Sequence, residues 1–563
     1  MTQETQHSQQ AQGAPQSPQS QTQDGLQAPR PQARHSAPDG QGSQAQHQTP
    51  DGQGEHPLFI DEVSRHQARY MKVVEFTHSA TKAAGIMLLA AIAALVLVNS
   101  PAGEAFEHFI HEPVGVFFGD QVASMSFGHV INDIFMAVFF LLVGLEIKYE
   151  MTVGELTNIR QALLPIVAAC GGVVAPIVIY SIFNAGNPAT AGGWGVPTAT
   201  DIAFALGILA LLGSRVPSGI RVFLSTLAVA DDIIAILVIA IFYGQAPSLA
   251  WIAAAAVVLL VGVALNKAHV YSLVPYLLVG VVLWYCVFMS GVHATIAGVL
   301  LAFVIPSGSR VNLRSFTAWS GKKIRQAHEA YKPDEPIIGQ EEYMRNVSNL
   351  SSVARLAIPP ATRLEHALYP WVYFAILPLF ALTNADVMLV GSDPASFFAN
   401  PALFGVFFGL LLGKPIGIML FSLAVVKVFK LAHLPENVTW KHVFGASILG
   451  GVGFTMAIFV ANLAYTNPAD VTCAKAAILA ASTLAGIIGF VVLLSAARAD
   501  AKRGVVYVTS AGADANLQVA DAEATEASRE LLDAIEDADR AHVEEFARPG
   551  RGVHEVAAHV KRD

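Results

Sequence analysis

Charged side chains and cysteines are both scarce in this chain of 563 residues. Only 14% of the residues are Asp, Glu, Lys or Arg, whereas 53% are hydrophobic and the mean hydropathy is +0.49. Soluble proteins hold about 25% charged residues, so this composition predicts a polytopic membrane protein. The three cysteines, Cys170, Cys286 and Cys473, form no CxxC pair, which argues against a disulfide framework or a zinc site and favours buried apolar positions. Dinucleotide-binding glycine motifs and a P-loop are lacking too, so ATP-driven transport has no support.

Two polar tails flank the apolar part of the chain. Residues 1–70 begin with a segment of about 55 residues rich in Gln, Ser, Pro and Gly, a composition that predicts disorder. This segment has no apolar h-region, so it is not expected to be a secretory signal peptide. Residues 499–563 are acidic and Ala-rich, with apolar spacing for one amphipathic helix at most. The membrane domain is therefore expected at residues 71–498.

Apolar runs divide residues 71–498 into about twelve candidate membrane spans, several of them longer than the roughly 20 residues that a bilayer crossing needs. Successive loops alternate between Lys/Arg-containing and Lys/Arg-free, which by the positive-inside rule places both termini in the cytoplasm. The long basic loop at 306–368 has too few apolar residues for a core of its own, so we expect a surface segment. The predicted spans are 80–99, 128–147, 162–183, 196–212, 217–243, 247–265, 272–288, 290–305, 369–386, 401–429, 443–465 and 473–497.

Three aspartates stand inside these apolar runs. Asp201 lies in the fourth predicted span, and Asp231 and Asp232 are adjacent in the fifth. A charge at the centre of a spanning helix costs about 2.5–3.5 kcal/mol on insertion scales, so three acids in one neighbourhood indicate cation binding or proton transfer. Lys414, in mid-span in GKPIG, is the one obvious counter-charge. At least one acid is then free to alternate between a proton and a cation.

Other polar residues in the apolar runs have structural explanations beside functional ones. Glu146 lies at the end of its predicted span, where an interfacial position explains it equally well. Asp133 is expected in structural hydrogen bonding or at a funnel. A histidine such as His293 more often packs between helices than acts as a switch, although histidine does titrate near neutral pH.

Two of the predicted spans are interrupted by helix-breaking residues. Pro197 and the following Thr and Asp residues break the fourth span, and Gly451 and Gly453 break the eleventh. Irregular backbone at membrane depth is tolerated only around a cavity or inside protein, and a pair of such breaks indicates the central site of a transporter. The two glycines are thus expected in structural or funnel positions. Spans 3–5 and 10–12 would be inverted repeats of an all-α membrane protein whose broken spans cross.

These residues resemble the NhaA-type bacterial sodium/proton antiporters. The resemblance covers about residues 70–498. It implies a secondary transporter, with neither enzymatic activity nor a cofactor, that exchanges Na+ or Li+ for a larger number of protons. It also implies a homodimer in the bacterial plasma membrane that serves pH and sodium homeostasis. The motifs that carry it are INDIFMAVFFLLVGLEIK, PTATDIAFALGILALLGSRVP, LAVADDIIAILVIAIFY, VGVVLWYCVFMSGVHATIAGV, GKPIG, LAHLPE and GGVGFTMAIF.

The resemblance also implies roles for single residues. Asp231 and Asp232 match the paired acids at which Na+ or Li+ and protons compete. Thr200 and Asp201 match an unwound stretch that assists ion binding and balances helix dipoles, with Thr200 a further Na+ ligand. Lys414 matches the lysine that pairs with an acid of the site, expected to be Asp231. Positions tied to activation by alkaline pH match Glu146, Glu365, His366 and His293.

Two departures affect this pH-sensing region. Tyr149 stands where the best-studied member of the family has an arginine, and Tyr369 stands where it has a histidine. The pH profile of the family is therefore carried over less safely than its transport chemistry.

Three other kinds of protein compete with this interpretation. A sodium-coupled solute symporter needs a pocket for an organic solute, which a dense Asp/Lys cluster with little aromatic lining does not favour. An intramembrane aspartyl protease needs facing acids on different helices in a GxGD-type context, which AVADD lacks. A degenerate scaffold or sensor would be expected to lose the cluster. We therefore expect the lipid bilayer as surroundings, and neither nucleic acid nor an organic substrate as a partner.

Overall fold

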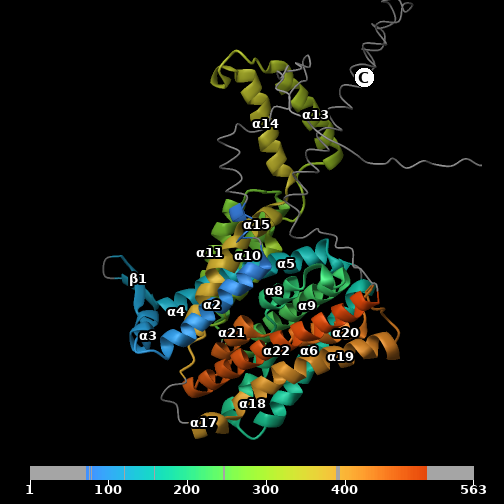
Figure 1. Cartoon of the computed structure of the whole chain (residues 1–563). Helices are drawn as coiled ribbons and strands as arrows, with labels where there is room; N and C mark the ends of the chain where they lie inside the picture. The colour runs from blue at the N-terminus through green and yellow to red at the C-terminus, as the bar shows by residue number, and fades with distance from the viewer. Residues whose placement is uncertain are drawn as a thin grey trace, which may run out of the picture. The chain divides into compact units, whose positions relative to one another are not determined.

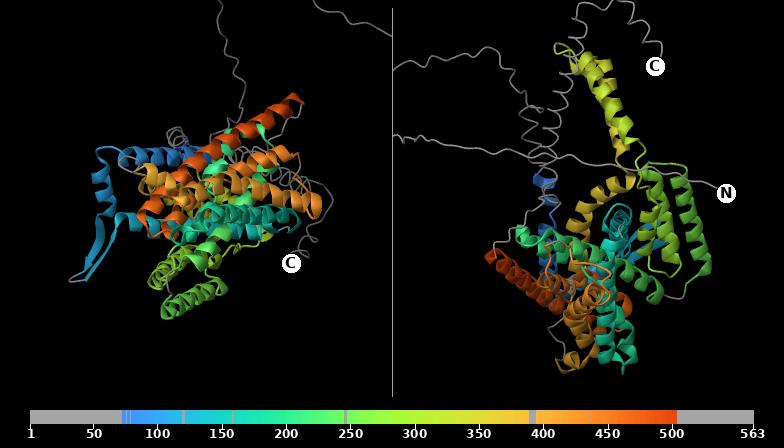
Figure 2. Two further views of the ribbon diagram at one scale, coloured as in Figure 1. Left: turned by 90° about the horizontal axis from the view of Figure 1, so that it is seen from below. Right: turned by 90° about the vertical axis from the view of Figure 1, so that its right-hand side faces the viewer.

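The computed structural model describes residues 79–503 apart from 119–120, 158, 245–246, 389–393 and 436, together with 72–74 and 76–77. Residues 1–70 and 504–563 belong to the two predicted tails and lie outside the described residues. The amphipathic helix expected in the second tail lies outside them too. The described chain is almost entirely helical, as predicted (Figure 1). Its one sheet among the described residues is an antiparallel pair, β1 (Pro113–Phe118) and β2 (Gln121–Ser126), with Val114 opposite Met125. Figure 2 shows this ribbon continuing from α3 (Gly103–His111) in a second view.

Eight stretches of helix are long and apolar enough to cross a membrane. Three of them contain π-helical turns, which often mark functional positions. The π-helical turns are η1 (Val130–Phe135), η6 (Val372–Ile376), η7 (Gly409–Gly413) and η8 (Ala424–Val428). The helices of the eight stretches are α2 (Ala80–Val98), α4 (Phe127–His129) with α5 (Met136–Thr152), α6 (Ile159–Asn184), α9 (Ser218–Phe242), α10 (Leu249–Lys267), α15 (Pro360–Trp371) with α16 (Leu377–Asn384), α18 (Pro401–Phe408) with α19 (Lys414–Leu423), and α22 (Pro468–Lys502).

Two further spans are broken, as the helix-breaking residues predicted. The first joins α7 (Pro188–Ala191) and η3 (Gly192–Thr198) to α8 (Ile202–Leu211) with a bend of 43°. The second joins α20 (Trp440–Leu449) to α21 (Phe454–Ala464) with a bend of 46°. Counting each bent pair as one span gives ten candidate spans in the described part of the chain.

The predicted count of twelve spans is not confirmed. The run predicted at 272–288 is α11 (Leu273–Met289), an apolar helix of 17 residues that is shorter than the eight others. The run predicted at 290–305 holds only α12 (Ile296–Val304), whose nine residues extend about 14 Å, half a bilayer core. Residues 290–295 are not helical, and Gly291 has a φ of 82°, so the chain turns before α12 begins.

The breaks of the two bent spans meet each other, which is the crossing that the inverted repeat requires. The backbone N–H of Asp201 donates to the carbonyl of Val452 at 2.8 Å, and Thr200 Oγ1 donates to the carbonyl of Gly450 at 2.9 Å. Polar groups at the break of one span thus form hydrogen bonds with backbone carbonyls at the break of the other. Such bonds are needed because no water is available in a membrane core to replace them. A Cβ on Gly451 would lie 2.6 Å from the carbonyl oxygen of Leu410, so only glycine fits there.

Helices α6 and α19 approach each other through a pair of glycines. A Cβ on Gly417 would lie 2.0 Å from the carbonyl oxygen of Gly171, and a Cβ on Gly171 would lie 2.4 Å from that of Gly417. Small residues at such crossings let the two backbones come into contact. Lipid provides no hydrophobic driving force for helix association, so this van der Waals packing stabilises the helix pair instead. The pair connects spans of the two predicted repeats.

Substitution of Gly417 by alanine is therefore expected to destabilise the protein by about 1–3 kcal/mol, because the added methyl must displace backbone. Thermal unfolding in detergent measures the effect. Gly85→Ala in α2 is the matched control, since a Cβ there meets nothing within 4 Å. Equal unfolding temperatures for the two variants would contradict the tight crossing.

The long loop at 306–368 is more ordered than the sequence indicated. It contains α13 (Leu313–Ala330), the short turn η5 (Ile337–Gly339) and α14 (Glu341–Ala357), with α13 packed against α14 (Figure 1). Polar contacts hold the pair together. Lys323 Nζ donates to Asn346 Oδ1 at 3.2 Å, and Gln340 Nε2 donates to the carbonyls of Lys332 and Glu335 at 2.7 Å each. The prediction looked for apolar core residues and so missed this helical hairpin.

Cysteine burial is only partly as predicted. Cys286 and Cys473 are buried, whereas Cys170 is exposed on α6 because it lies on the helix's outer face. The remaining short elements are η2 (Glu155–Thr157), η4 (Gly213–Arg215) and α17 (Pro394–Ala399).

Candidate ion-binding site

The deepest charged group of the bundle is Lys414, the first residue of α19 and fully buried. Its ammonium contacts Asp231 Oδ2 of α9 and Thr200 Oγ1 at the break of the fourth predicted span. A buried ion pair is tolerable only where its hydrogen bonds are also satisfied, and the Thr200 hydroxyl serves that purpose. The expected pairing of Lys414 with Asp231 is thus present as a contact.

Asp201 is engaged in capping two helices. Its Oδ1 accepts from the N–H of Phe204 at 3.0 Å, which caps α8. Its Oδ2 accepts from the N–H and the hydroxyl of Thr455 at 3.1 and 2.5 Å, at the start of α21. The positive ends of two helix dipoles therefore meet at one buried carboxylate, which neutralises them.

Asp232 differs from both other aspartates. It is buried, and it makes no hydrogen bond to any described residue. It lines a small cavity at the crossing of the broken spans together with Thr200, Asp201 and Thr455. Asp231 Oδ1 is likewise buried without a partner. Free carboxylate oxygens beside a hydroxyl are ligands that a hard cation prefers.

The oxygen set is too small to be the cage of a resident metal. Within the described part of the chain, no three His, Cys, Asp or Glu side chains are grouped so that they could hold a metal ion. An alkali cation at Asp232 would therefore complete its coordination with hydroxyl, carbonyl or water oxygens. Such an incomplete set suits an ion that enters and leaves.

Two clefts approach this site from one end of the bundle. One has a volume of about 680 Å³ and is lined by Glu150, Arg221 and Ser225 among others; the second, of about 770 Å³, lies beside it, and both reach Thr226. Ser225 precedes Asp232 by seven residues, so it lies on the same face of α9, about 10 Å along the axis. The first cleft therefore lies on the same face of α9 as Asp232, about two helical turns from it.

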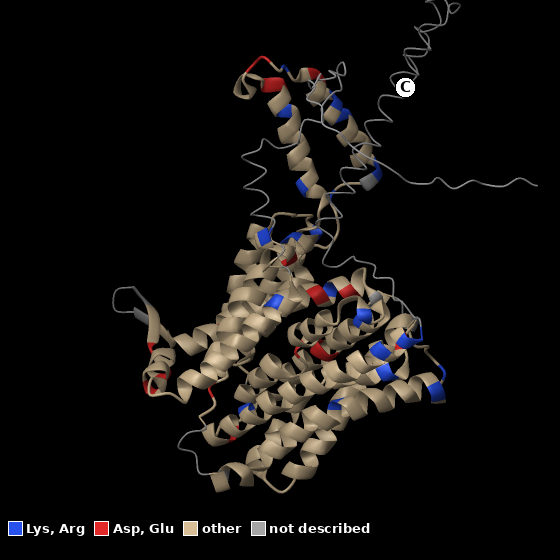
Figure 3. Cartoon of the chain, in the orientation of Figure 1, with Lys and Arg blue, Asp and Glu red and all other residues tan. Residues whose placement is uncertain are grey.

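Lysine and arginine gather at one end of the bundle (Figure 3). Arg221, near the start of α9, lines the first cleft. Contacts confirm that this end is shared: His442 Nε2 near the start of α20 lies 3.2 Å from Asp500 Oδ2 near the end of α22, and Lys427 lies over the ring of Trp440 at 5.4 Å. We call it the basic end, defined by Arg215, Arg221, Lys427, Lys441 and Arg498.

Known proteins resemble this chain in sequence. The family model described as Na+/H+ antiporter 1 matches residues 74–493. The Na(+)/H(+) antiporter NhaA of Acidithiobacillus ferrooxidans is 44% identical over 430 residues, which cover 75% of this chain and 97% of the relative. The NhaA antiporter of Oleidesulfovibrio alaskensis is 44% identical over 410 residues, which cover 73% of this chain and 90% of the relative. The NhaA antiporter of Wolinella succinogenes is 40% identical over 418 residues, which cover 74% of this chain and 92% of the relative. The chain belongs to the NhaA Na+/H+ antiporter family. It is a multi-pass membrane protein of a family that exchanges Na+ and H+.

The four residues that the NhaA resemblance linked to pH activation are not gathered in one place. Glu146 on α5 and Glu365 on α15 lie on helices that pack together, and Glu146 accepts a hydrogen bond from the hydroxyl of Tyr373 at 3.4 Å. His366 is exposed. His293 Nε2 bonds the carbonyl of Tyr243, which follows the end of α9 away from the basic end, at 2.7 Å. Only the two glutamates can act on each other directly.

The two tyrosines that depart from the NhaA pattern differ in their surroundings. Tyr149 is exposed and lines the 680 Å³ cleft. Tyr369 lies against Tyr373, with ring centroids 4.3 Å apart. Because Tyr373 both lines the cavity of Asp232 and donates to Glu146, it connects the central site of the antiporter to Glu146. The sequence analysis did not single out Tyr373, since a lone tyrosine in an apolar run carries no distinguishing signal.

Asp133 and Lys148 stand outside the central site of the antiporter. Asp133 lies in η1, and its backbone carbonyl accepts from Trp284 Nε1 at 3.3 Å. Lys148 donates to the carbonyls of Ala302 and Phe303 at 3.3 and 3.0 Å, so it caps the end of α12. A cation at a helix C-terminus is favoured by the dipole. The sequence placed Lys148 with Glu146 at the end of a span, where an interfacial position explained both, so this capping role was not predicted.

Proposed function

We propose that the protein extrudes Na+ or Li+ from a bacterial cell in exchange for protons, with cation and proton competing at Asp232 and Asp231. The observation that carries this proposal is the contrast between neighbouring acids. Lys414 neutralises Asp231, whereas Asp232 faces the cavity with no hydrogen-bond partner among the described residues. An uncompensated buried carboxylate is costly, so it must take up either a proton or a cation.

Competition at one group makes the exchange obligatory. A proton on Asp232 removes the charge that attracts Na+, and a bound Na+ removes the basicity that attracts a proton. The Asp232 carboxylate is therefore neutralised only when it holds one or the other, and a bare carboxylate crosses the low-dielectric barrier only at high cost. Rocking of the broken spans against the other helices then exposes the loaded site to the opposite side, as in transporters built from inverted repeats.

The second acid supplies a second proton. Protonation of Asp231 releases Lys414 from its ion pair, so one turn of the cycle carries two protons against one cation. Net positive charge then moves inward with the protons. A membrane potential set by potassium and valinomycin in proteoliposomes should accelerate exchange; a rate independent of that potential would refute the electrogenic cycle.

The basic end of the bundle is assigned to the cytoplasm by the positive-inside rule. Both clefts then open to the cytoplasm, and both termini lie there. Cysteine labelling of an added C-terminal cysteine in intact cells tests this orientation, because an impermeant reagent must not reach it. We infer a homodimer from the family resemblance alone, and a monomer mass by light scattering would refute it.

Everted membrane vesicles provide the decisive assay of the exchange itself. Vesicles from an antiporter-deficient bacterial host that expresses the protein are energised by respiration, and a pH-sensitive dye reports the acid interior. Addition of Na+ or Li+ at pH 7–9 should dequench the dye, because cation enters as protons leave. Vesicles without the protein are the control, and K+ is tested in parallel.

Two results would contradict the proposal. The absence of any response to Na+ or Li+ across that pH range would exclude antiport. A response that appears only after an organic solute is added would favour a sodium-coupled symporter instead.

A further inference from the structure

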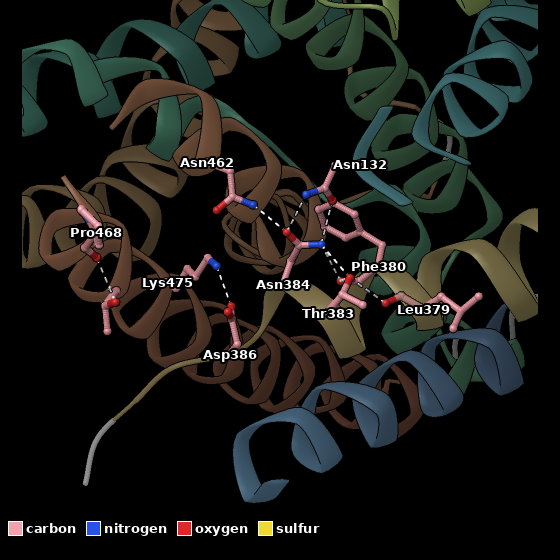
Figure 4. Close-up of polar contacts among 10 residues, drawn as sticks. Asn132, Leu379, Phe380, Thr383, Asn384, Asp386, Asn462, Pro468 and Lys475 are labelled. Carbon is pink, nitrogen blue, oxygen red and sulfur yellow. Dashed lines mark hydrogen bonds and ion pairs between the residues drawn. The ribbon is translucent and has the colours of Figure 1, made fainter. Parts of the chain in front are cut away.

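Three asparagine side chains from three different spans meet away from the basic end (Figure 4). Asn384, the last residue of α16, donates to Asn132 Oδ1 of η1 at 2.9 Å, and Asn132 donates back to Asn384 Oδ1 at 3.2 Å. Asn462 of α21 donates to the same Asn384 oxygen at 2.7 Å. We call these three residues the asparagine triad.

The triad lies in register with the cavity of Asp232. Each of its three spans also contributes a residue to that cavity, and in each case the asparagine stands seven residues farther from the basic end. In an α-helix seven residues are about two turns, or about 10 Å, which returns a side chain to nearly the same face, as for Asn384 and Asn462. Asn132, in the π-helical turn η1, is placed beside them by its hydrogen bonds with Asn384. The amides therefore lie along the continuation of the cavity. The pairs of cavity residue and asparagine are Phe139 and Asn132, Leu377 and Asn384, and Thr455 and Asn462.

A layer of buried phenylalanines lies between the cavity and the triad. Phe459 stands between Thr455 and Asn462 on α21, Phe380 stands between Leu377 and Asn384 on α16, and their ring centroids are 6.2 Å apart. Phe140, next to the cavity residue Phe139, packs against Phe459 with ring centroids 5.6 Å apart, and all three rings are buried. Apolar rings cannot replace the water around a cation, so this layer closes the route while the clefts at the basic end are open.

The triad has the chemistry to hold a cation outside this layer. Amide oxygens are hard ligands of the kind that alkali and alkaline-earth cations take. Asn462 is half-buried, and its Oδ1 makes no hydrogen bond to any described residue. Just beyond, Asp386 is paired with Lys475 at 2.6 Å, so Asn462 Oδ1 is the triad oxygen that is left to accept a cation without losing a hydrogen bond among the described residues.

We propose that the asparagine triad is a second cation site, an outer station for Na+ or Li+ between the phenylalanine layer and the extracellular side. The cation leaving Asp232 passes the rings when the bundle changes conformation and is then held by the amide oxygens before full hydration. This inference rests on the proposed function. Its competitor is a purely structural role, in which the amides only brace three helices.

Sided transport assays separate these two roles. The variant is Asn462→Leu, which keeps the size and removes the oxygen; Asn462→Asp keeps an oxygen. Half-saturation by Na+ is measured from the cytoplasmic side in everted vesicles. It is measured from the extracellular side in right-side-out vesicles under a reversed proton gradient. We expect Asn462→Leu to raise the extracellular half-saturation concentration of Na+ about tenfold and to change the cytoplasmic one less than twofold. Asn462→Asp, which keeps an oxygen, should retain the wild-type extracellular value.

Asn400→Leu is the matched control. Asn400 is another half-buried asparagine away from the basic end, and it donates to Asp470 at 2.6 Å outside the triad. Asn400→Leu should change neither the extracellular nor the cytoplasmic half-saturation by Na+. Stabilisation of the purified protein by Li+ against heat, which reports the central site, should be unchanged in Asn462→Leu.

Two outcomes would overturn the outer station. One is an extracellular half-saturation in Asn462→Leu equal to those of the wild type and Asn400→Leu. The other is an equal change on both sides together with a lower unfolding temperature, as bracing predicts. Failure of the proposed function is recognised separately, because the wild type would then show no exchange from either side, and both proposals would fall.

Discussion

Asp232→Asn abolishes cation/proton exchange if the free carboxylate in the cavity is the group at which Na+ and H+ compete. Asparagine keeps the size of the side chain but can neither release a proton nor neutralise a cation. Loss of the charged partner of a buried ion costs about 3 kcal/mol or more, which corresponds to at least about a hundredfold in rate or affinity. The dequenching rate in everted vesicles, normalised to the amount of protein, measures the loss.

The control for this variant is Asp500→Asn. Asp500 is also a buried acid, but it lies 3.2 Å from His442 Nε2 at the basic end, outside the cavity. We expect it to keep exchange activity. Stabilisation by Li+ should disappear in Asp232→Asn and persist in the control. Exchange by Asp232→Asn at more than a tenth of the wild-type rate would show that competition takes place elsewhere.

Lys414→Met destabilises the folded protein by about 3–5 kcal/mol, because it leaves the Asp231 carboxylate buried without its counter-charge. The methionine side chain fills nearly the same volume, so the effect reports the charge and not a cavity. Thermal unfolding of the purified protein in detergent at neutral pH measures it. The free energy of unfolding should fall far more than for an exposed control such as Lys322→Met.

A second substitution distinguishes charge from packing. Asp231→Asn in the Lys414→Met background removes the stranded carboxylate, so the double variant should regain about 2 kcal/mol or more of stability relative to Lys414→Met. A double variant no more stable than Lys414→Met would show that the ion pair does not carry the loss. Transport is expected to stay impaired in the double variant, since the two-proton cycle needs Asp231.

The breaks of the two bent spans could be predicted because helix breakers act locally. Pro197 removes a backbone donor, and consecutive glycines such as Gly450 and Gly451 weaken a helix wherever they stand. Buried aspartates were equally evident, since a charge within an apolar run is costly in any fold. These features depend only on neighbours in the chain.

The number of spans was less predictable, because apolar composition does not show where a helix ends. The run at 290–305 is apolar enough for a span, yet the chain turns around Gly291 and leaves only nine residues for α12. In the loop at 306–368, polar contacts such as that of Lys323 with Asn346 hold two helices together. A search for apolar periodicity does not detect such contacts.

The amino-acid sequence by itself determined the family, the membrane-embedded helical fold, the two broken spans and the acids and lysine in their midst. Only the tertiary structure decided which acid is committed and which is free. Lys414 and Asp231 are 183 positions apart, and Asn132 and Asn384 are 252 apart. No local pattern encodes such distances, because they follow from how the helices pack. Asp232 stands out as the proposed ion site only because the packing of the helices places Lys414 beside Asp231.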